Sequence, residues 1–295
     1  MARNRVVISL WILMLLGCAS GPSNHYSRGV DEYNRGHIPE AIYEYTRAIE
    51  LNPRDPLPRF NLAVIYQDQE RNEEARRLYR SILDLHPDYA PAMANLASIE
   101  EKEGNCQAAE TLYVRAQRME SRNPVVSCQY GFFLLRSGRI DEAEKTFREA
   151  LRRDPGCANA FFGLGIIASR QGNETQALDY FKATTRLNPS DVEAYLKAAD
   201  LMTLQGNRTE AIRFFRKAAA LDPKRGLTYL QMGRLLHEEG ELKDAEKALD
   251  QALSLGAPRE DCEAELSGIY SKLAVEAARN CRMERKAPAV AVTDP

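Results

Sequence analysis

Small and hydrophobic residues recur along this chain of 295 residues with a period of 34. Blocks that begin at residues 22, 56, 90, 124, 158, 192 and 226 align without any insertion or deletion. Each block holds two stretches of about a dozen residues whose apolar positions are spaced three and four apart, which is typical of amphipathic helices. No block has the alternating pattern of a strand. The sequence therefore predicts an all-α chain of seven helix-turn-helix repeats.

Three columns of this alignment carry residues that suit the packing of two helices. Position 8 is always glycine or alanine, position 20 is always alanine, and position 24 is tyrosine, phenylalanine or leucine. Small residues let the two helices approach closely, and the large residue fills the remaining space. Since three repeats carry alanine at position 8, we expect Gly165→Ala to be tolerated and Gly165→Leu or Ala177→Leu to be destabilising.

Two further columns predict where the helices end. Position 15 is glycine in six repeats, as expected for a left-handed residue after a helix, and Glu70 is the exception. Position 32 is proline in five repeats, with Ser121 and Ala257 in its place in the other two, and proline ends the second helix.

These columns resemble the tetratricopeptide repeat, and the resemblance covers residues 22–259. It implies a right-handed superhelical solenoid that binds proteins. Residues 260–286 continue as one amphipathic helix, which we expect to cap the stack. Residues 287–295 have little to bury and are expected to be disordered.

The first residues are typical of an export signal. Two arginines precede an apolar run that is too short to cross a bilayer, so residues 1–17 are expected to be a signal peptide. The segment around Cys18 resembles the bacterial lipobox, which implies lipidation of this cysteine, with residues 18–21 as a short tether. Ala19 and Ser20 follow, and the absence of aspartate after the cysteine implies sorting to the outer membrane, facing the periplasm.

The sequence contains segments that resemble a dinucleotide site and a zinc site, but neither has the context that such a site requires. A net charge of −2 with scattered basic residues disfavours nucleic-acid binding. The dinucleotide-like run at Gly163 lies within a predicted helix, and the segment from His237 has glutamate where a zinc site needs a second histidine. We therefore expect no enzyme activity, no metal, no cofactor and no small-molecule substrate.

Five cysteines follow Cys18, and export would place them in an oxidising compartment. Cys128 and Cys157 stand near one end of a predicted helix pair, so a disulfide is possible there. Cys262 and Cys281 lie 19 residues apart on one predicted helix, a rise of roughly 28 Å, and should not pair.

In a stack of this kind the first helix of each repeat lines a groove, and its positions 5 and 9 point the same way. The candidate apolar groove residues are Phe60, Val64, Phe132, Phe162, Ile166, Leu196 and Leu230. Either they form an exposed strip that binds a partner, or neighbouring side chains cover them. Position 6 carries Asn61 and Asn95, and similar repeats of a glycosyltransferase hold an extended peptide with asparagines there. The alternative is a pair of exposed polar residues.

The sequence thus predicts a lipid-anchored scaffold for protein partners in the bacterial envelope. Its layout is similar to that of the repeat lipoproteins that help pilus secretins assemble. Two alternatives remain open: a component of polysaccharide or protein export, and a recruiter of peptidoglycan hydrolases or proteases.

Overall fold

The structure is a computed structural model that describes residues 21–119 and 124–284. These residues form 15 α-helices and no strand, which confirms the predicted all-α fold of helix-turn-helix repeats. The chain divides into two compact units, Met1–Pro155 and Gly156–Pro295. The predicted signal peptide, Cys18 and the tail at residues 287–295 lie outside the described residues.

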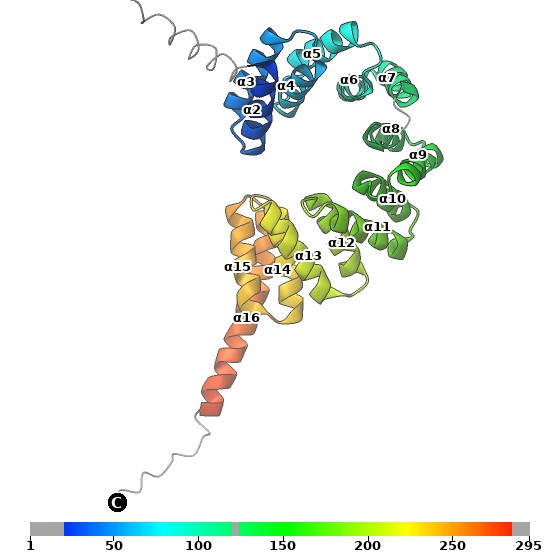
Figure 1. Cartoon of the computed structure of the whole chain (residues 1–295). Helices are drawn as coiled ribbons and strands as arrows, with labels where there is room; N and C mark the ends of the chain where they lie inside the picture. Colours follow the sequence, from blue (N-terminus) through cyan, green and yellow to red (C-terminus); the bar gives the residue numbers. More distant parts are fainter. Residues whose placement is uncertain (1–20, 120–123, 285–295) are drawn as a thin grey trace, which may run out of the picture. The chain divides into compact units, whose positions relative to one another are not determined.

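The first unit contains four helix pairs, which follow one another along the chain (Figure 1). The pairs are α2 (Pro22–Asn34) with α3 (Ile38–Leu51), α4 (Pro56–Asp68) with α5 (Asn72–Leu85), α6 (Ala90–Lys102) with α7 (Cys106–Met119), and α8 (Pro124–Arg136) with α9 (Ile140–Arg153).

The second unit contains three further pairs and a final single helix. The pairs are α10 (Ala158–Arg170) with α11 (Glu174–Leu187), α12 (Val192–Leu204) with α13 (Arg208–Leu221), and α14 (Gly226–Glu239) with α15 (Leu242–Ser254). The final helix is α16 (Arg259–Glu284), which carries both Cys262 and Cys281 without a break.

The turn within each pair has a residue in the left-handed region at position 15. Six of these residues are glycines with φ between 75° and 85°, and Glu70 has a φ of 59°. Glu70 keeps the hydrogen bonds of the glycine turns, because the Arg71 N–H donates to the Tyr66 carbonyl at 2.8 Å as the His37 N–H does to Glu32 at 2.9 Å. The turn therefore keeps the same left-handed conformation at Glu70, although a residue with a β-carbon disfavours that conformation.

Position 8 packs directly against position 24 of the same repeat. A β-carbon built on Gly165 would lie 2.7 Å from Cε1 of Phe181, and one on Gly131 would lie 2.7 Å from Cε1 of Phe147. Real β-carbons do not approach other atoms so closely. The expected tolerance of Gly165→Ala therefore requires the Phe181 ring to shift, because at its present place the ring occupies the space of the new β-carbon.

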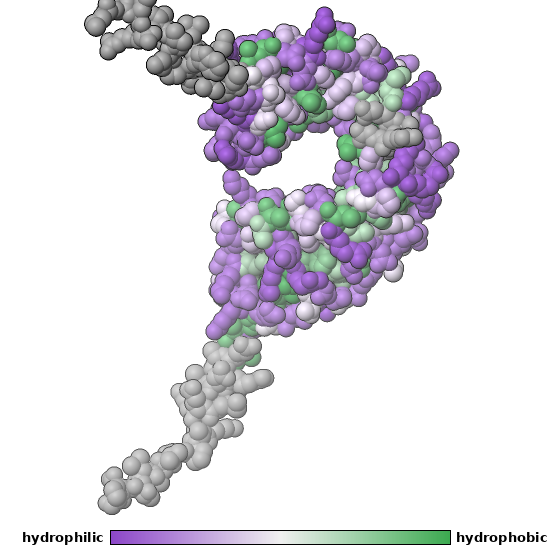
Figure 2. Space-filling view, viewed as in Figure 1, coloured by the Kyte–Doolittle hydropathy of each residue, from purple (hydrophilic) through white to green (hydrophobic). Residues whose placement is uncertain are grey.

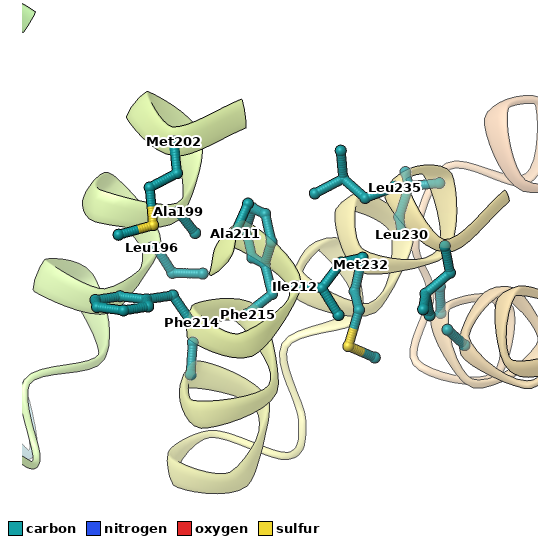
Figure 3. Packing of buried hydrophobic residues seen from close by; sticks show 14 of the residues in the cluster. Leu196, Ala199, Met202, Ala211, Ile212, Phe214, Phe215, Leu230, Met232 and Leu235 are labelled. Atoms are coloured by element: carbon teal, nitrogen blue, oxygen red, sulfur yellow. The ribbon is translucent and has the colours of Figure 1, made fainter. Parts of the chain in front are cut away.

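The core of the second unit lies between successive helices. Figure 3 shows Leu196 and Ala199 of α12 facing Ala211 and Phe215 of α13, and all four are buried. The alanines at position 20 are fully buried in all seven repeats, which confirms the reading of that column.

Helix α16 packs on the last repeat through its buried face. Cys262 and Ile269 are fully buried in the same cluster as the core of α14 and α15. The Glu265 carboxylate accepts a hydrogen bond from Nδ1 of His237 in α14 at 2.9 Å, and Arg234 pairs with Asp261 at 2.9 Å. These contacts hold α16 against α14 and cover apolar residues that would otherwise face water.

Candidate functional site

The first helices of the four repeats in the first unit form a repeating surface. We define the first-helix face as positions 5, 6 and 9 of α2, α4, α6 and α8. It comprises Tyr26, Ser27, Val30, Phe60, Asn61, Val64, Ala94, Asn95, Ser98, Cys128, Gln129 and Phe132. Ala94 and Cys128 are buried, and most of the others are half-buried.

Two side-chain amides on this face, Asn95 and Gln129, form a continuous hydrogen-bonded row with Tyr79 and Gln67. Gln129 donates to the Asn95 carbonyl at 2.8 Å, and Asn95 donates to the Tyr79 hydroxyl at 3.0 Å. Tyr79 then donates to the Gln67 side chain at 2.9 Å. Burial raises the pKa of Tyr79, so its phenol stays neutral and keeps its proton as a donor. The row fixes the orientation of Asn95 and Gln129, the amides of the third and fourth repeats.

Asn61 belongs to the same column but is held less firmly. Its amide nitrogen lies 3.5 Å from the Tyr26 oxygen and 3.3 Å from the Tyr45 oxygen. Both distances are longer than the usual 2.9–3.0 Å of an N–H···O bond. The Asn61 amide can therefore exchange these contacts for a better acceptor at little cost.

The predicted aromatic residues of the first unit contribute to both the core and the surface. The Phe60 ring lies 5.9 Å from that of Tyr79 and 5.7 Å from that of Tyr89, and the Phe132 ring lies edge-on to Phe147 at 5.0 Å. Both phenylalanines are half-buried. Each of the two alternatives for the groove therefore holds in part, since these rings are packed on one side and accessible on the other.

The predicted groove residues of the second unit differ in exposure. Phe162 lies edge-on to Phe181 at 5.5 Å, and it and Ile166 are half-buried. Leu196 and Leu230, however, are only 8% and 2% exposed. The structure corrects the prediction at these two positions: Leu196 faces α13 (Figure 3), and Leu230 shares a buried cluster with residues of α16. Neither offers a surface to a partner.

Sequence reasoning missed two residues of the first unit that belong to the site. Gln129 stands at position 6, one repeat after Asn95, and a search of that column for any amide would have found it. Tyr33, at position 12 of the first repeat, is 39% exposed beside Val30 and Asn61. The repeat pattern predicts that positions 5, 6 and 9 face the groove and gives no such signal for position 12.

Other kinds of site find little support in the part of the chain that the structure describes. There, no group of three or more histidine, cysteine, aspartate or glutamate side chains is arranged to hold a metal ion. None of the described helices combines the length and hydropathy needed to span a bilayer. In the view of Figure 2 the surface is mostly hydrophilic, with hydrophobic residues in small separate patches.

The repeat geometry and the family comparison agree. The family described as the Cilia and flagella-associated protein 70 C-terminal domain, a tetratricopeptide-repeat domain, matches residues 59–269, and the TPR repeat itself matches residues 29–70. The chain therefore belongs to the tetratricopeptide-repeat family. Proteins of this family are scaffolds that bind protein partners and are generally not catalytic.

Two curated relatives are assembly proteins. The chain is 31% identical over 108 residues to the type IV pilus assembly protein PilF of Pseudomonas aeruginosa, covering 36% of this chain and 43% of PilF. It is 32% identical over 90 residues to the photosystem I assembly protein Ycf3 of Cyanophora paradoxa, covering 29% of this chain and 51% of Ycf3. The chain thus spans about half or less of the length of these relatives.

Solved structures extend the likeness. The structure of Pseudomonas aeruginosa PilF is 25% identical with a TM-score of 0.62, and the match covers 72% of this chain and 98% of that one. The fold is also that of a chain in the APC/C hetero-tetramer Cut9-Hcn1, at 14% identity, a TM-score of 0.64 and 87% coverage of this chain and 54% of the other.

Proposed function

We propose that this scaffold is an outer-membrane lipoprotein that holds an extended segment of a protein subunit along the first-helix face during assembly of an envelope machine. The best-supported machine is the type IV pilus with its secretin. The proposal assigns the chain a binding role and no catalytic step.

The observation that carries the binding mode is the row of side-chain amides. An amide offers both a donor and an acceptor, as a peptide group does. Asn61, Asn95 and Gln129 present one such group per repeat, and Tyr79 and Gln67 orient the central one. A regular series of amides suits a backbone in extended conformation, whose own N–H and C=O groups are unpaired.

The similarity to PilF supports the choice of machine, because the likeness covers nearly all of that solved chain. Two assembly proteins among the relatives support a role in building a complex rather than in its activity. The resemblance of the segment around Cys18 to a lipobox supports the lipid anchor.

Anchoring would place the first repeat beside the membrane. Fully extended, the four residues from Ala19 to Pro22 reach about 14 Å. A segment bound near the first repeat would then lie within a short distance of the inner leaflet of the outer membrane, where a subunit about to enter that membrane must be delivered.

The test is complementation of a strain that lacks the gene, with fractionation of the membranes and native electrophoresis of the secretin. The wild-type chain should restore secretin rings, and Cys18→Ser should leave the protein out of the outer membrane and reduce the rings. Asn95→Ala with Gln129→Ala should retain localisation and reduce the rings. Normal rings in the deleted strain would refute the pilus assignment and favour a machine of the export or cell-wall type. An unlipidated mature protein would refute the anchor.

A further inference from the structure

We propose that a cavity between the first two repeats binds one branched aliphatic side chain of the partner, with Asn61 binding the peptide group beside it. The inference rests on the proposed function and adds the residue type that the partner must carry.

The walls of the cavity come from three helices. Val30 and Tyr33 belong to α2, Tyr45 belongs to α3, and Asn61 and Val64 belong to α4. Two valines face the space from neighbouring repeats, and the two tyrosine rings complete its apolar lining. All five residues lie within the first unit, so the cavity is a feature of one compact body.

The size of the cavity selects the side chain. Its volume is about 110 Å³. A cavity of about 150 Å³ lined by aliphatic residues holds benzene. The space here therefore suits the four carbons of leucine or isoleucine, leaves alanine underpacked, and is too small to take the whole indole of tryptophan. Apolar walls and a shape of this size favour a branched aliphatic group over a charged one.

The Asn61 amide lies at the same place and can bind a peptide group of the partner. The Asn61 amide makes only long contacts, at 3.5 and 3.3 Å, to two phenol oxygens. The Tyr45 ring is only 1% exposed and forms a buried wall beside this amide, and burial raises the pKa of its phenol.

The equivalent positions one repeat further on show what a closed version looks like. There Gln67 replaces Tyr33 and accepts a hydrogen bond from Tyr79, and Asn95 donates to Tyr79 at 3.0 Å. Ser98 replaces Val64 at position 9. The site between the second and third repeats is therefore polar and internally hydrogen-bonded, whereas the cavity between the first and second repeats is apolar and its Asn61 amide makes only long contacts. The partner's aliphatic anchor is therefore assigned to the first and second repeats, and its backbone contacts to the second, third and fourth.

The probe is N-acetyl-leucine N-methylamide, which carries one leucine side chain between two peptide groups. Full-length protein in detergent, with ¹³C-labelled valine methyl groups, is titrated with this compound. Ligand efficiencies for small molecules predict a dissociation constant on the order of 1 mM. The Val30 and Val64 signals should shift in a saturable manner. The corresponding tryptophan compound should bind at least tenfold more weakly, and the alanine compound at least fivefold more weakly.

Val64→Phe should fill the cavity and abolish the response of Val30. Ser98→Phe, the same change one repeat further on, should leave it intact, and the thermal midpoints of both variants report whether they fold. If Val64→Phe unfolds, Tyr33→Ala provides a second test, since it removes a wall and should weaken binding at least threefold. No saturable shift at Val30 or Val64, or equal binding of the leucine and tryptophan compounds, overturns the proposal.

These outcomes are separable from the fate of the proposed function. Suppose that Asn95→Ala with Gln129→Ala abolishes the secretin rings but that the leucine compound does not bind at Val30. The proposed scaffold function would then stand, and the proposed leucine pocket would be refuted. Suppose instead that leucine binding depends on Val64 but that the protein has no effect on the secretin. The proposed pocket would then stand, and the assignment to the pilus would be refuted.

Discussion

The backbone of Gly165 lies against the ring of Phe181, at a distance that leaves no room for a β-carbon. Gly131 has the same relation to Phe147, and Gly233 to Leu249. Positions 8 and 24 of one repeat are thus a coupled pair, and the size of one residue sets the placement of the other.

Gly165→Ala should therefore lower the free energy of unfolding. Overpacking a core costs about 1–3 kcal/mol, and the gain of helix propensity from glycine to alanine returns only about 0.5–1 kcal/mol. Urea denaturation measures the difference. In a double-mutant cycle, Gly165→Ala should cost less in a Phe181→Ala background, because the ring atoms that the new β-carbon would meet are then absent. Additive losses would contradict a direct contact.

Glu70→Gly should stabilise the first unit. The left-handed conformation costs a residue with a β-carbon about 1–2 kcal/mol, and glycine avoids this cost but gains freedom in the unfolded chain. The expected net gain is about 0.5–1 kcal/mol. Gly104→Glu is the reciprocal control, since Gly104 has a φ of 85° and no atom near its missing β-carbon. A loss of stability on Glu70→Gly would mean that the Glu70 side chain stabilises the turn by contacts.

Stability should fall in alkaline solution as buried tyrosines ionise. Burial, aided by the Glu101 carboxylate, raises the pKa of Tyr113 to about 12 from an ordinary value of 10. The folded state thus holds the proton more tightly, so this contribution is complete below pH 10 and is lost as pH rises through 12. It amounts to at most about 2–3 kcal/mol.

Unfolding curves between pH 8 and 12 test this expectation. Tyr113→Phe should flatten the decline, whereas Tyr43→Phe, at a tyrosine that is 61% exposed, should not. An identical decline in both variants would place the alkaline sensitivity elsewhere.

Much of the fold follows from the sequence because the repeat constrains each column separately. Alanine at position 20 suits the close approach of two helices, and glycine at position 15 suits the turn, so alanine could be recognised in seven copies and glycine in six. The strain at Glu70 was also visible as a single departure. The placement of the Phe181 ring over Gly165 could not be predicted in this way. A single column of the alignment does not show that the residue at position 24 packs against the residue at position 8.

The candidate site was predicted less completely. Asn61 and Asn95 were recognised by residue type, but Gln129 was missed although it continues the row. Leu230 was assigned to the groove from its position, and the structure buries it in the cluster that includes α16. The position of a residue within a repeat predicts the direction in which its side chain points. The exposure of that side chain also depends on the helices that follow in the chain.

Site-specific photo-crosslinking in living cells tests the central claim, that the first-helix face binds a protein segment. A photoreactive residue is placed at Val64 or Gln129 on that face, or at the exposed positions Arg77 and Lys145 on the second helices of the same unit. The account predicts that Val64 and Gln129 capture the same protein, identified by mass spectrometry, and that Arg77 and Lys145 do not. Capture of that partner from Arg77 or Lys145, with none from Val64 or Gln129, would contradict it.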